Sequence, residues 1–202
     1  MKILALIALA IIALPRVAVA APTVASIDTA NSVVQWTGRK VTGSHFGTVK
    51  IKEGNAIIES GKLVGGTFEI DMSSISVEDI TNPRDNAKLR DHLKSDDFFG
   101  SSLFPTTTFS ITKAEPIVNA GPGEANYNIF GDLTIKGITN PLSFPAIVTI
   151  DGGVATAKAS VEVDRTKYNV RYGSGRFFQN LGNRLIYDQF EVSLDLKASS
   201  QG

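Results

Sequence analysis

The stretch TFEIDM at residues 67–72 alternates polar and apolar side chains, with Phe68, Ile70 and Met72 in phase on one side. Three further stretches keep the same two-residue period: YNIFGDLTIK at 127–136, ATAKASVEV at 155–163 and FEVSLDL at 190–196. Successive side chains of a strand face opposite sides of a sheet, so this period predicts strands buried on one face only. The other face meets water, because it carries these charged residues: Glu69, Asp71, Lys136, Lys158, Glu162, Glu191 and Asp195.

Turn-forming residues separate the predicted strands at hairpin spacing. We expect strands near 33–41, 47–53, 55–59 with 62–72, 106–114, 126–136, 142–150, 154–164 and 186–197. The connections are rich in glycine, asparagine and aspartate: Glu53-Gly54-Asn55, Ser60-Gly61, Gly121-Pro122-Gly123 and Asp151-Gly152-Gly153. Asn140-Pro141 and Phe144-Pro145 place residues near 141–145 at a strand start or a sheet edge. About eight antiparallel strands without a repeat period favour a closed barrel over a sandwich.

The N-terminus has the plan of a cleaved signal peptide. Lys2 supplies a positive charge, an apolar run follows from Ile3 to Leu14, and Ala18-Val19-Ala20 is a small-x-small cleavage site. The apolar run is shorter than the roughly 20 residues that span a membrane. We therefore expect residues 1–20 to be removed, a mature chain that begins at Ala21, and a periplasmic location.

Composition narrows the class of protein. Removing 20 of 202 residues leaves 182, enough for one domain with a substantial core. The predicted mature chain has 18 basic and 20 acidic side chains, and this balance gives no overall electrostatic footprint for nucleic acid or an anionic membrane. The sequence has no cysteine, which excludes disulfides and thiolate metal sites.

Small residues at inward positions bear on whether the barrel is filled. An eight-stranded barrel is just wide enough for side chains to fill, or for one small ligand. Several expected inward positions hold glycine or alanine: Gly66, Gly131, Ala146, Ala155, Ala157 and Ala159. One interpretation is that they pack against large residues across the barrel, as cores alternate large and small side chains. We favour the other, an internal apolar cavity, because three alternate alanines on one strand exceed what such packing requires.

Two segments interrupt the strand pattern. In residues 80–105, Asn82 can cap a short helix with Pro83 at its first position, and Leu89 and Leu93 then share one face. Residues 164–184 are dense in arginine, tyrosine and glycine, and no helix pattern after a buried strand supports a phosphate-binding loop there. We expect this second segment to be a long loop that covers one end of the barrel.

Several motifs resemble those of the YceI-like proteins, periplasmic lipocalin-like barrels that bind polyisoprenoids. The resemblance covers nearly all of the expected mature chain. Its motifs are WTGRKVTGSHFGTVKI at 36–51, GGTFEIDMSSI at 65–75, HLKSDDFF at 92–99 followed by FPTTTF at 104–109, and GDLTIKGIT at 131–139. The family usually has aspartate where this chain has Gly100, a departure that affects a surface turn. The resemblance implies an all-β fold: an extended antiparallel eight-stranded lipocalin-like barrel with a short capping helix.

The resemblance also implies a long hydrophobic tunnel for an isoprenoid lipid, of the quinone or polyprenyl phosphate type. The apolar cavity inferred from the small inward residues agrees with this implication, since an isoprenoid tail needs only an apolar wall. The residues expected on that wall are Trp36, Phe68, Ile70, Met72, Phe109, Ile129, Leu133, Phe144, Ala157, Ala159 and Phe190. Polar residues near the strand ends are candidates for the head group: Arg39, His45, His92 and Arg171. Each of these four can instead cap a strand end or pair with an aspartate.

Other functions have weaker support. The segment DHLKSDD at 91–97 lacks the ligand spacing of known zinc and calcium sites, so we expect neither metal nor cofactor. A hydrolase needs a nucleophile, a base and an orienting group, for which Ser44 or Ser95 with His92 and Asp96 are the available residues. No nucleophile elbow is present, so we expect no catalysis.

A structural or stress-related interaction protein with a filled barrel is the main alternative. Transient membrane contact fits the lipid interpretation, and the sequence leaves a homodimer open.

Overall fold

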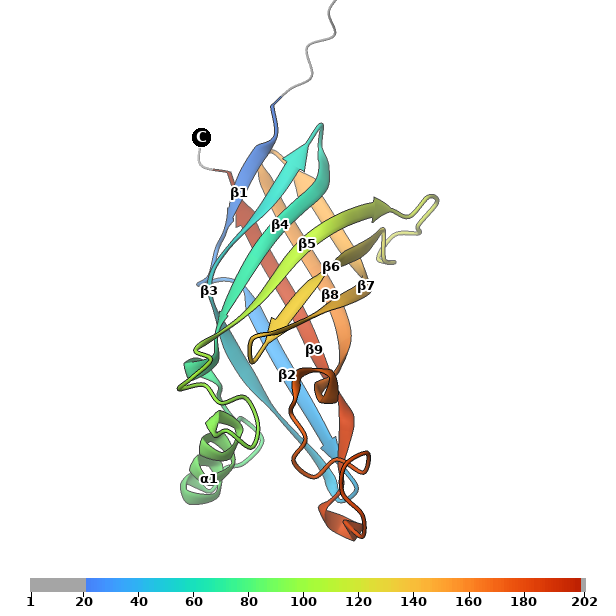
Figure 1. Ribbon diagram of the computed structural model, residues 1–202. Coiled ribbons are helices and arrows are strands. Elements are labelled where there is room, and N and C mark those ends of the chain that lie inside the picture. The colour runs from blue at the N-terminus through green and yellow to red at the C-terminus, as the bar shows by residue number, and fades with distance from the viewer. Residues whose placement is uncertain (1–20, 201–202) are drawn as a thin grey trace, which may run out of the picture.

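Antiparallel strands wind into a closed barrel in the computed structural model, which describes residues 21–200 (Figure 1). The strands in this part of the chain are β1 Thr23–Ile27, β2 Val33–Lys40, β3 Gly43–Glu59, β4 Lys62–Asp71, β5 Thr106–Pro116, β6 Tyr127–Ile135, β7 Ile138–Asp151, β8 Val154–Asp164 and β9 Ile186–Ser199. The helical elements are α1 Pro83–Lys94 and the short 3₁₀ turns η1 Met72–Ser74, η2 Arg165–Tyr168 and η3 Gly182–Arg184. The expected signal peptide, residues 1–20, lies outside the described residues.

The long strand β3 closes the barrel. Its first half pairs with β2 from Gly43 to Val49, and its second half pairs with β4 from Lys50 to Glu59. The short strand β1 pairs with the end of β3 and with the end of β9, so β1 and β2 occupy the same position in the ring. Eight positions therefore surround the barrel, which confirms the predicted fold class.

The predicted alternation sets the two faces of the sheet. On β8, Val161 and Val163 are buried, whereas Lys158 and Glu162 are exposed. Lys158 forms an ion pair with Asp195 on the neighbouring strand β9 across the outer face. The prolines of β7 also lie as expected: β8 pairs with β7 only from Ile147 onward, so the segment before it is an edge on that side.

Two strand predictions were incomplete. The turn expected at Glu53-Gly54-Asn55 is instead part of β3, which has an irregularity in its pairing between Ile51 and Glu53. Gly54 lies opposite Phe68, and a Cβ at this glycine would stand 3.1 Å from the Phe68 ring, so the glycine makes room for the ring within the ladder. Strand β1 was missed because only Ala25 and Ile27 of its five residues face inward, too few to show a period.

The predicted helix is present with its predicted cap. The side chain of Asn82 accepts hydrogen bonds from the backbone N–H groups of Arg84 and Asp85, at 2.9 and 3.2 Å. Leu89 and Leu93 pack from α1 into a buried cluster with Met72, Ile75, Val77, Phe98 and Val170. Helix α1 and the 165–185 connection lie at the same end of the barrel (Figure 1). We call this the loop end, and the opposite end, which β1 and the β3–β4 and β7–β8 hairpins form, the hairpin end.

The segment that precedes α1 is hydrogen-bonded to the first half of β3, which β4 does not cover. Ser76 and Glu78 donate backbone hydrogen bonds to the carbonyls of Thr48 and Phe46, both at 2.9 Å. The indole Nε1 of Trp36 donates to the Ser76 carbonyl at 3.1 Å. This segment therefore covers the edge of β3 that β4 leaves open and holds α1 against the barrel.

Candidate functional site: an apolar cavity along the barrel

The barrel encloses a cavity that runs from the hairpin end to the loop end. About 270 Å³ is open to the centres of water molecules, and forty residues from all nine described strands, α1 and the neighbouring segments line it. Only five of the lining residues have polar side chains other than an indole: Thr107, Thr156, Arg165, Tyr187 and Gln189. Of these, Thr156, Tyr187 and Gln189 are exposed to solvent. The wall is otherwise aliphatic and aromatic.

The eleven residues that the sequence predicted for the tunnel all lie on this wall. They are Trp36, Phe68, Ile70, Met72, Phe109, Ile129, Leu133, Phe144, Ala157, Ala159 and Phe190. The residues that the prediction missed include Leu93, Phe98 and Phe99, which reach the cavity from α1 and the turn that follows it. The apolar face of α1 was visible in the sequence, but which surface it covers depends on the packing of the connection. Contact between these residues and a lipid remains a prediction.

The small inward residues do two different things. At Gly131 a Cβ would stand 2.5 Å from Cζ of Phe109, so this glycine makes room for a ring and fits the packing interpretation. Ala155, Ala157 and Ala159 instead line the cavity side by side on β8. The alanines therefore widen the lumen, as the cavity interpretation expected.

The chemistry of the wall restricts what the cavity can hold. A buried water needs about 10–15 Å³ of such volume and two to four polar partners. The measured space could hold on the order of twenty waters by that criterion, yet the wall offers few groups to bind them. The cavity is therefore suited to an apolar occupant.

Of the forty described residues that line the cavity, only Arg165 is charged, and it is 4% exposed. Its guanidinium donates to the carbonyls of Val170, Tyr172, Ile186 and Tyr187 at 2.8–3.0 Å. Burial lowers its pKa, an effect that the nearby carboxylates of Asp188 and Asp164 oppose, and an arginine remains charged after such a shift. Arg165 therefore ties the loop to the start of β9 instead of presenting free donors to the lumen.

None of the four head-group candidates lies on the cavity wall. Arg39 is on the outer face and pairs with Glu191 at 3.1 Å. His45 Nδ1 lies 2.7 Å from Asp79, and His92 Nε2 lies 3.3 Å from Asp97. The Arg171 guanidinium stacks over the ring of Phe177 at 4.7 Å. The two histidines thus pair with aspartates, as the alternative interpretation expected, whereas Arg39 pairs with a glutamate and Arg171 with an aromatic ring.

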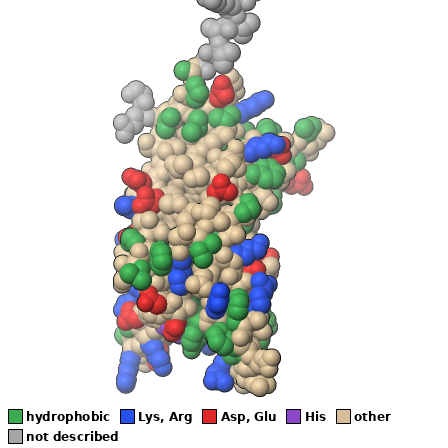
Figure 2. Space-filling view, in the orientation of Figure 1, with side chains coloured by type: hydrophobic (Ala, Val, Ile, Leu, Met, Phe, Trp, Pro, Cys, Tyr) green, Lys and Arg blue, Asp and Glu red, His purple; other side chains and the backbone are tan. Residues whose placement is uncertain are grey.

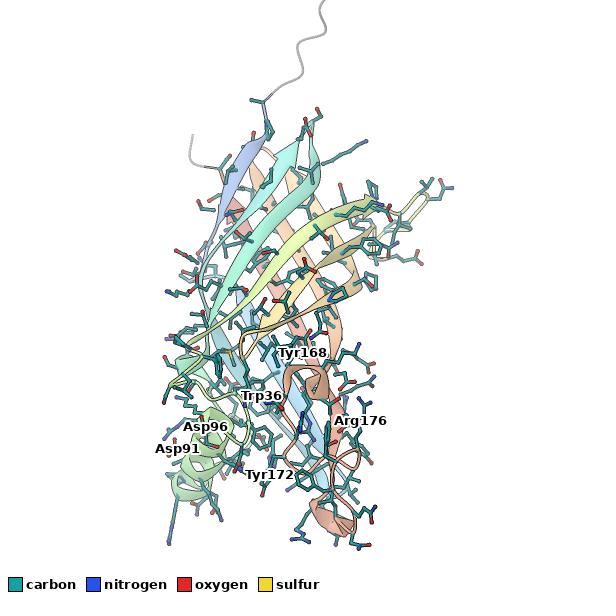
Figure 3. All side chains as sticks on the ribbon, in the orientation of Figure 1. Trp36, Asp91, Asp96, Tyr168, Tyr172 and Arg176 are labelled. Carbon is teal, nitrogen blue, oxygen red and sulfur yellow. The ribbon has the colours of Figure 1, made fainter. Side chains whose placement is uncertain are left out.

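His92 is nevertheless close to the loop end of the cavity. Its ring packs edge-on against Tyr172, with centroids 4.5 Å apart, and against Phe98, with centroids 4.9 Å apart. Phe98 lines the cavity, and Tyr172 belongs to the 165–185 connection, on the side toward α1 (Figure 3). Sequence reasoning did not identify Tyr172, because the contact joins segments that are eighty residues apart.

Two aspartates fasten the covering segments. Burial disfavours the charged form of Asp79, but hydrogen bonds from His45 and from the Phe46 N–H outweigh it and keep the pKa of Asp79 below its usual value. Burial likewise opposes ionisation of Asp164, but the Thr166 hydroxyl and N–H and the charge of Arg176 keep the pKa of Asp164 low. Both carboxylates are therefore ionised at neutral pH and hold the loop end in place.

In the described part of the chain, the His92 ring forms no hydrogen bond with Ser44, Ser95 or Asp96, the residues considered for hydrolysis. The Ser95 hydroxyl donates to the backbone carbonyl of His92 at 2.7 Å, whereas the His92 ring pairs with Asp97. Within residues 21–200, no group of three histidine or acidic side chains could hold a metal ion. In the same part of the chain, no helix is long and apolar enough to span a bilayer.

A protein-family model matches this chain over residues 26–198, and its description is "YceI-like domain". Two solved structures share the fold. BcnA of Burkholderia cenocepacia is 22% identical with a TM-score of 0.63, covering 86% of this chain and 99% of that one. A structure described as a polyisoprenoid binding domain from Saccharophagus degradans, implicated in plant cell wall breakdown, is 12% identical with a TM-score of 0.61, covering 88% and 98%.

Curated relatives carry only a family designation. A UPF0312 protein of Shewanella denitrificans is 29% identical over 100 residues, which are 50% of this chain and 47% of the relative. A UPF0312 protein of Vibrio vulnificus is 32% identical over 88 residues, 40% of this chain and 44% of the relative. The chain thus spans about half the length of the curated relatives it matches.

Proposed function

This chain belongs to the YceI-like family, and on that premise we propose that it binds a long isoprenoid lipid, of the quinone or polyprenyl phosphate type, inside its barrel. The observation that supports this most directly is the wall of forty residues, on which Arg165 is the only charged side chain. The polyisoprenoid-binding domain of Saccharophagus degradans shares the fold and agrees in ligand class. The lipid would be cargo, with no metal or cofactor involved.

The reference state for such a lipid is a membrane. A tail of about 40 carbons would gain on the order of 30 kcal/mol on leaving water, at about 0.8 kcal/mol per methylene. That exceeds the practical limit of non-covalent affinity, near 20 kcal/mol. Moving a tail from one apolar medium to another gains little, so we propose transient membrane contact or loading during folding. Slow escape into water would then retain the cargo.

The site of action in this proposal is the periplasm. It depends on the signal-peptide plan of residues 1–20. N-terminal sequencing of protein from the periplasmic fraction should begin at Ala21. Recovery in a detergent-soluble membrane fraction with Met1 or Lys2 intact would contradict export.

The decisive test of binding is mass spectrometry of organic extracts from protein purified without detergent. We expect an isoprenoid lipid in the parent protein and much less in Ala157→Trp, whose indole would occupy part of the lumen. Val118→Trp, at a position 82% exposed on a loop far from the cavity, is the matched control and should keep its lipid. No extractable lipid in the parent, together with strong destabilisation of Ala157→Trp, would indicate a filled barrel instead.

We propose a non-catalytic role for the two histidines. Replacing His45 or His92 by alanine should change stability or cargo retention, because each ring pairs with an aspartate. Loss of turnover on a lipid ester in His92→Ala, with folding and lipid content unchanged, would favour the hydrolase.

A further inference from the structure

Charge is distributed unevenly between the two ends of the barrel, although the whole chain is balanced. At the loop end, the 165–185 connection contains five basic residues and no acidic one, whereas the neighbouring segment 72–105, which includes α1, contains four basic and six acidic residues. The connections on the opposite side, 60–61, 117–126 and 152–153, contain a single acidic residue, Glu124, and no basic one. Figure 2 shows lysine and arginine side chains around the loop end, with apolar side chains between them and acidic side chains on the left.

Aromatic side chains accompany this charge and remain exposed. Tyr172, Phe177 and Phe178 are 45%, 41% and 49% exposed. The β2–β3 turn adds Val41, whose N–H donates to the carbonyl of Leu185. Together with Arg171 and Arg184, these residues form what we call the loop-end surface. Neither arginine has an ion-pair partner among the residues that the structure describes.

The loop that presents these aromatics is fastened from beneath. Tyr168, Val170 and Ser174 are at most 2% exposed, and the carbonyls of Val170 and Tyr172 accept hydrogen bonds from Arg165. The backbone N–H groups of Phe177 and Phe178 both donate to the Ser174 carbonyl. The rings are therefore held outward by an ordered scaffold, while the buried side chains of the same segment fill the core.

We propose that the loop-end surface docks the protein on an anionic lipid bilayer. Aromatic rings surrounded by arginines are the composition of segments that lie in the membrane interface, where the rings enter the headgroup boundary and the cations meet anionic lipids. A protein partner would not require this net positive charge, whereas an anionic lipid surface complements it directly.

The loop-end surface lies next to the cavity, so docking would place the cavity close to the bilayer. Tyr172 packs on Phe98, with ring centroids 5.5 Å apart, and Phe98 lines the cavity. Docking through this end would bring the lumen to the bilayer, so that a tail could pass without crossing bulk water. In this respect the inference rests on the proposed function and names the partner of the same site. The attraction to lipid itself depends only on the surface.

Flotation of the purified protein with vesicles tests the proposal. We use phosphatidylcholine alone and phosphatidylcholine with 30% phosphatidylglycerol at low salt. Two double variants address the surface: Arg171→Gln with Arg184→Gln, and Phe177→Ser with Phe178→Ser. The control is Val118→Ser with Lys62→Gln, exposed positions at the other end.

We expect binding to anionic vesicles to exceed binding to neutral ones. Each charge removed should weaken it by about fivefold, from about 1 kcal/mol per basic residue near such a surface. The arginine variant should thus lose on the order of 25-fold, the phenylalanine variant about tenfold or more, and the control nothing. Higher salt should weaken the parent, because charges are screened beyond about 10 Å at 0.1 M.

The outcomes separate this inference from the proposed cargo. Equal binding to both vesicle types, or loss of binding in the control but not in the loop-end variants, would overturn the docking surface. Protein that carries isoprenoid lipid but never floats would also overturn it while leaving the proposed function intact. Flotation that depends on the loop-end residues, in protein without extractable lipid, would support docking and refute the cargo.

Discussion

The two ends of the barrel are closed by different chemistry. At the hairpin end, strand side chains alone pack together, with Ala25, Ala56 and Ala198 each at most 6% exposed. At the loop end, α1 and the 165–185 connection cover the barrel and are fastened by Asn82, Asp79 and Arg165. Closure of the hairpin end therefore depends on the fit of small apolar residues. Closure of the loop end depends on a few polar residues that anchor the covering segments. We therefore expect that the loop end can be released while the strands stay paired.

Removing the central anchor should have the largest effect on stability. Arg165→Met would leave four carbonyls without their donor and Asp188 without its buried partner, a change that costs about 3–5 kcal/mol for a buried pair. Urea unfolding measures it. Arg176→Met is the control, because that guanidinium is largely exposed and its pairs are worth about 1 kcal/mol or less. A similar small loss in both variants would show that Arg165 is not the anchor.

Enlarging one alanine at the hairpin end and one in the middle of the barrel should give unequal results. Ala25→Leu overpacks a site with no exposed surface and should cost about 1–3 kcal/mol. Ala157→Leu extends into the cavity, so we expect a change in stability below about 1 kcal/mol. Thermal melting of the two variants, side by side, provides the comparison. Equal destabilisation would mean that the lumen around β8 is as tightly packed as the hairpin end.

The cap of α1 should affect the loop end alone. Asn82→Ala removes the acceptor of two backbone N–H groups, a loss of about 1 kcal/mol. We expect faster hydrogen exchange in α1, with exchange in β5 to β8 unchanged. Asn128→Ala, on the exposed face of β6, is the control. Uniformly faster exchange throughout the barrel would contradict a separable loop end.

Acid should loosen the loop end through Asp79 and Asp164. Because the folded pKa of each is below its unfolded value, their stabilisation is present above about pH 4, the ordinary pKa of aspartate, and is lost as pH falls through the folded pKa. Melting temperature should therefore drop below pH 4, and Asp79→Asn should be less stable at neutral pH and show a smaller drop. A parallel curve for Asp79→Asn and the parent would exclude this carboxylate as the source.

Periodic features were predictable from sequence, and contacts between distant segments were not. The residues of β4 and β8 that face the interior follow from the alternation of polar and apolar side chains, and Asn82-Pro83 marks the start of α1. These features depend on neighbours in the chain.

The positions of the polar side chains depend instead on tertiary geometry. Arg39 lies on the outer face because Gly38 and Trp36 take the inward positions of β2. The balanced total charge likewise suggested no attraction to an anionic membrane. That inference used the total charge of the chain. Only the fold shows that the basic residues of 165–185 lie together at one end of the barrel.

The pairing of β1 with the end of β9 has a practical consequence. It brings Ile27 opposite Ala198, so the first and last described strands meet at the hairpin end, away from α1 (Figure 1). A fluorophore, affinity handle or solid support attached near residue 200 would leave the loop end facing outward. Immobilised through that position, every molecule would present the same face to vesicles flowing past. The barrel is thus suited to an oriented biosensor without any change to its lumen.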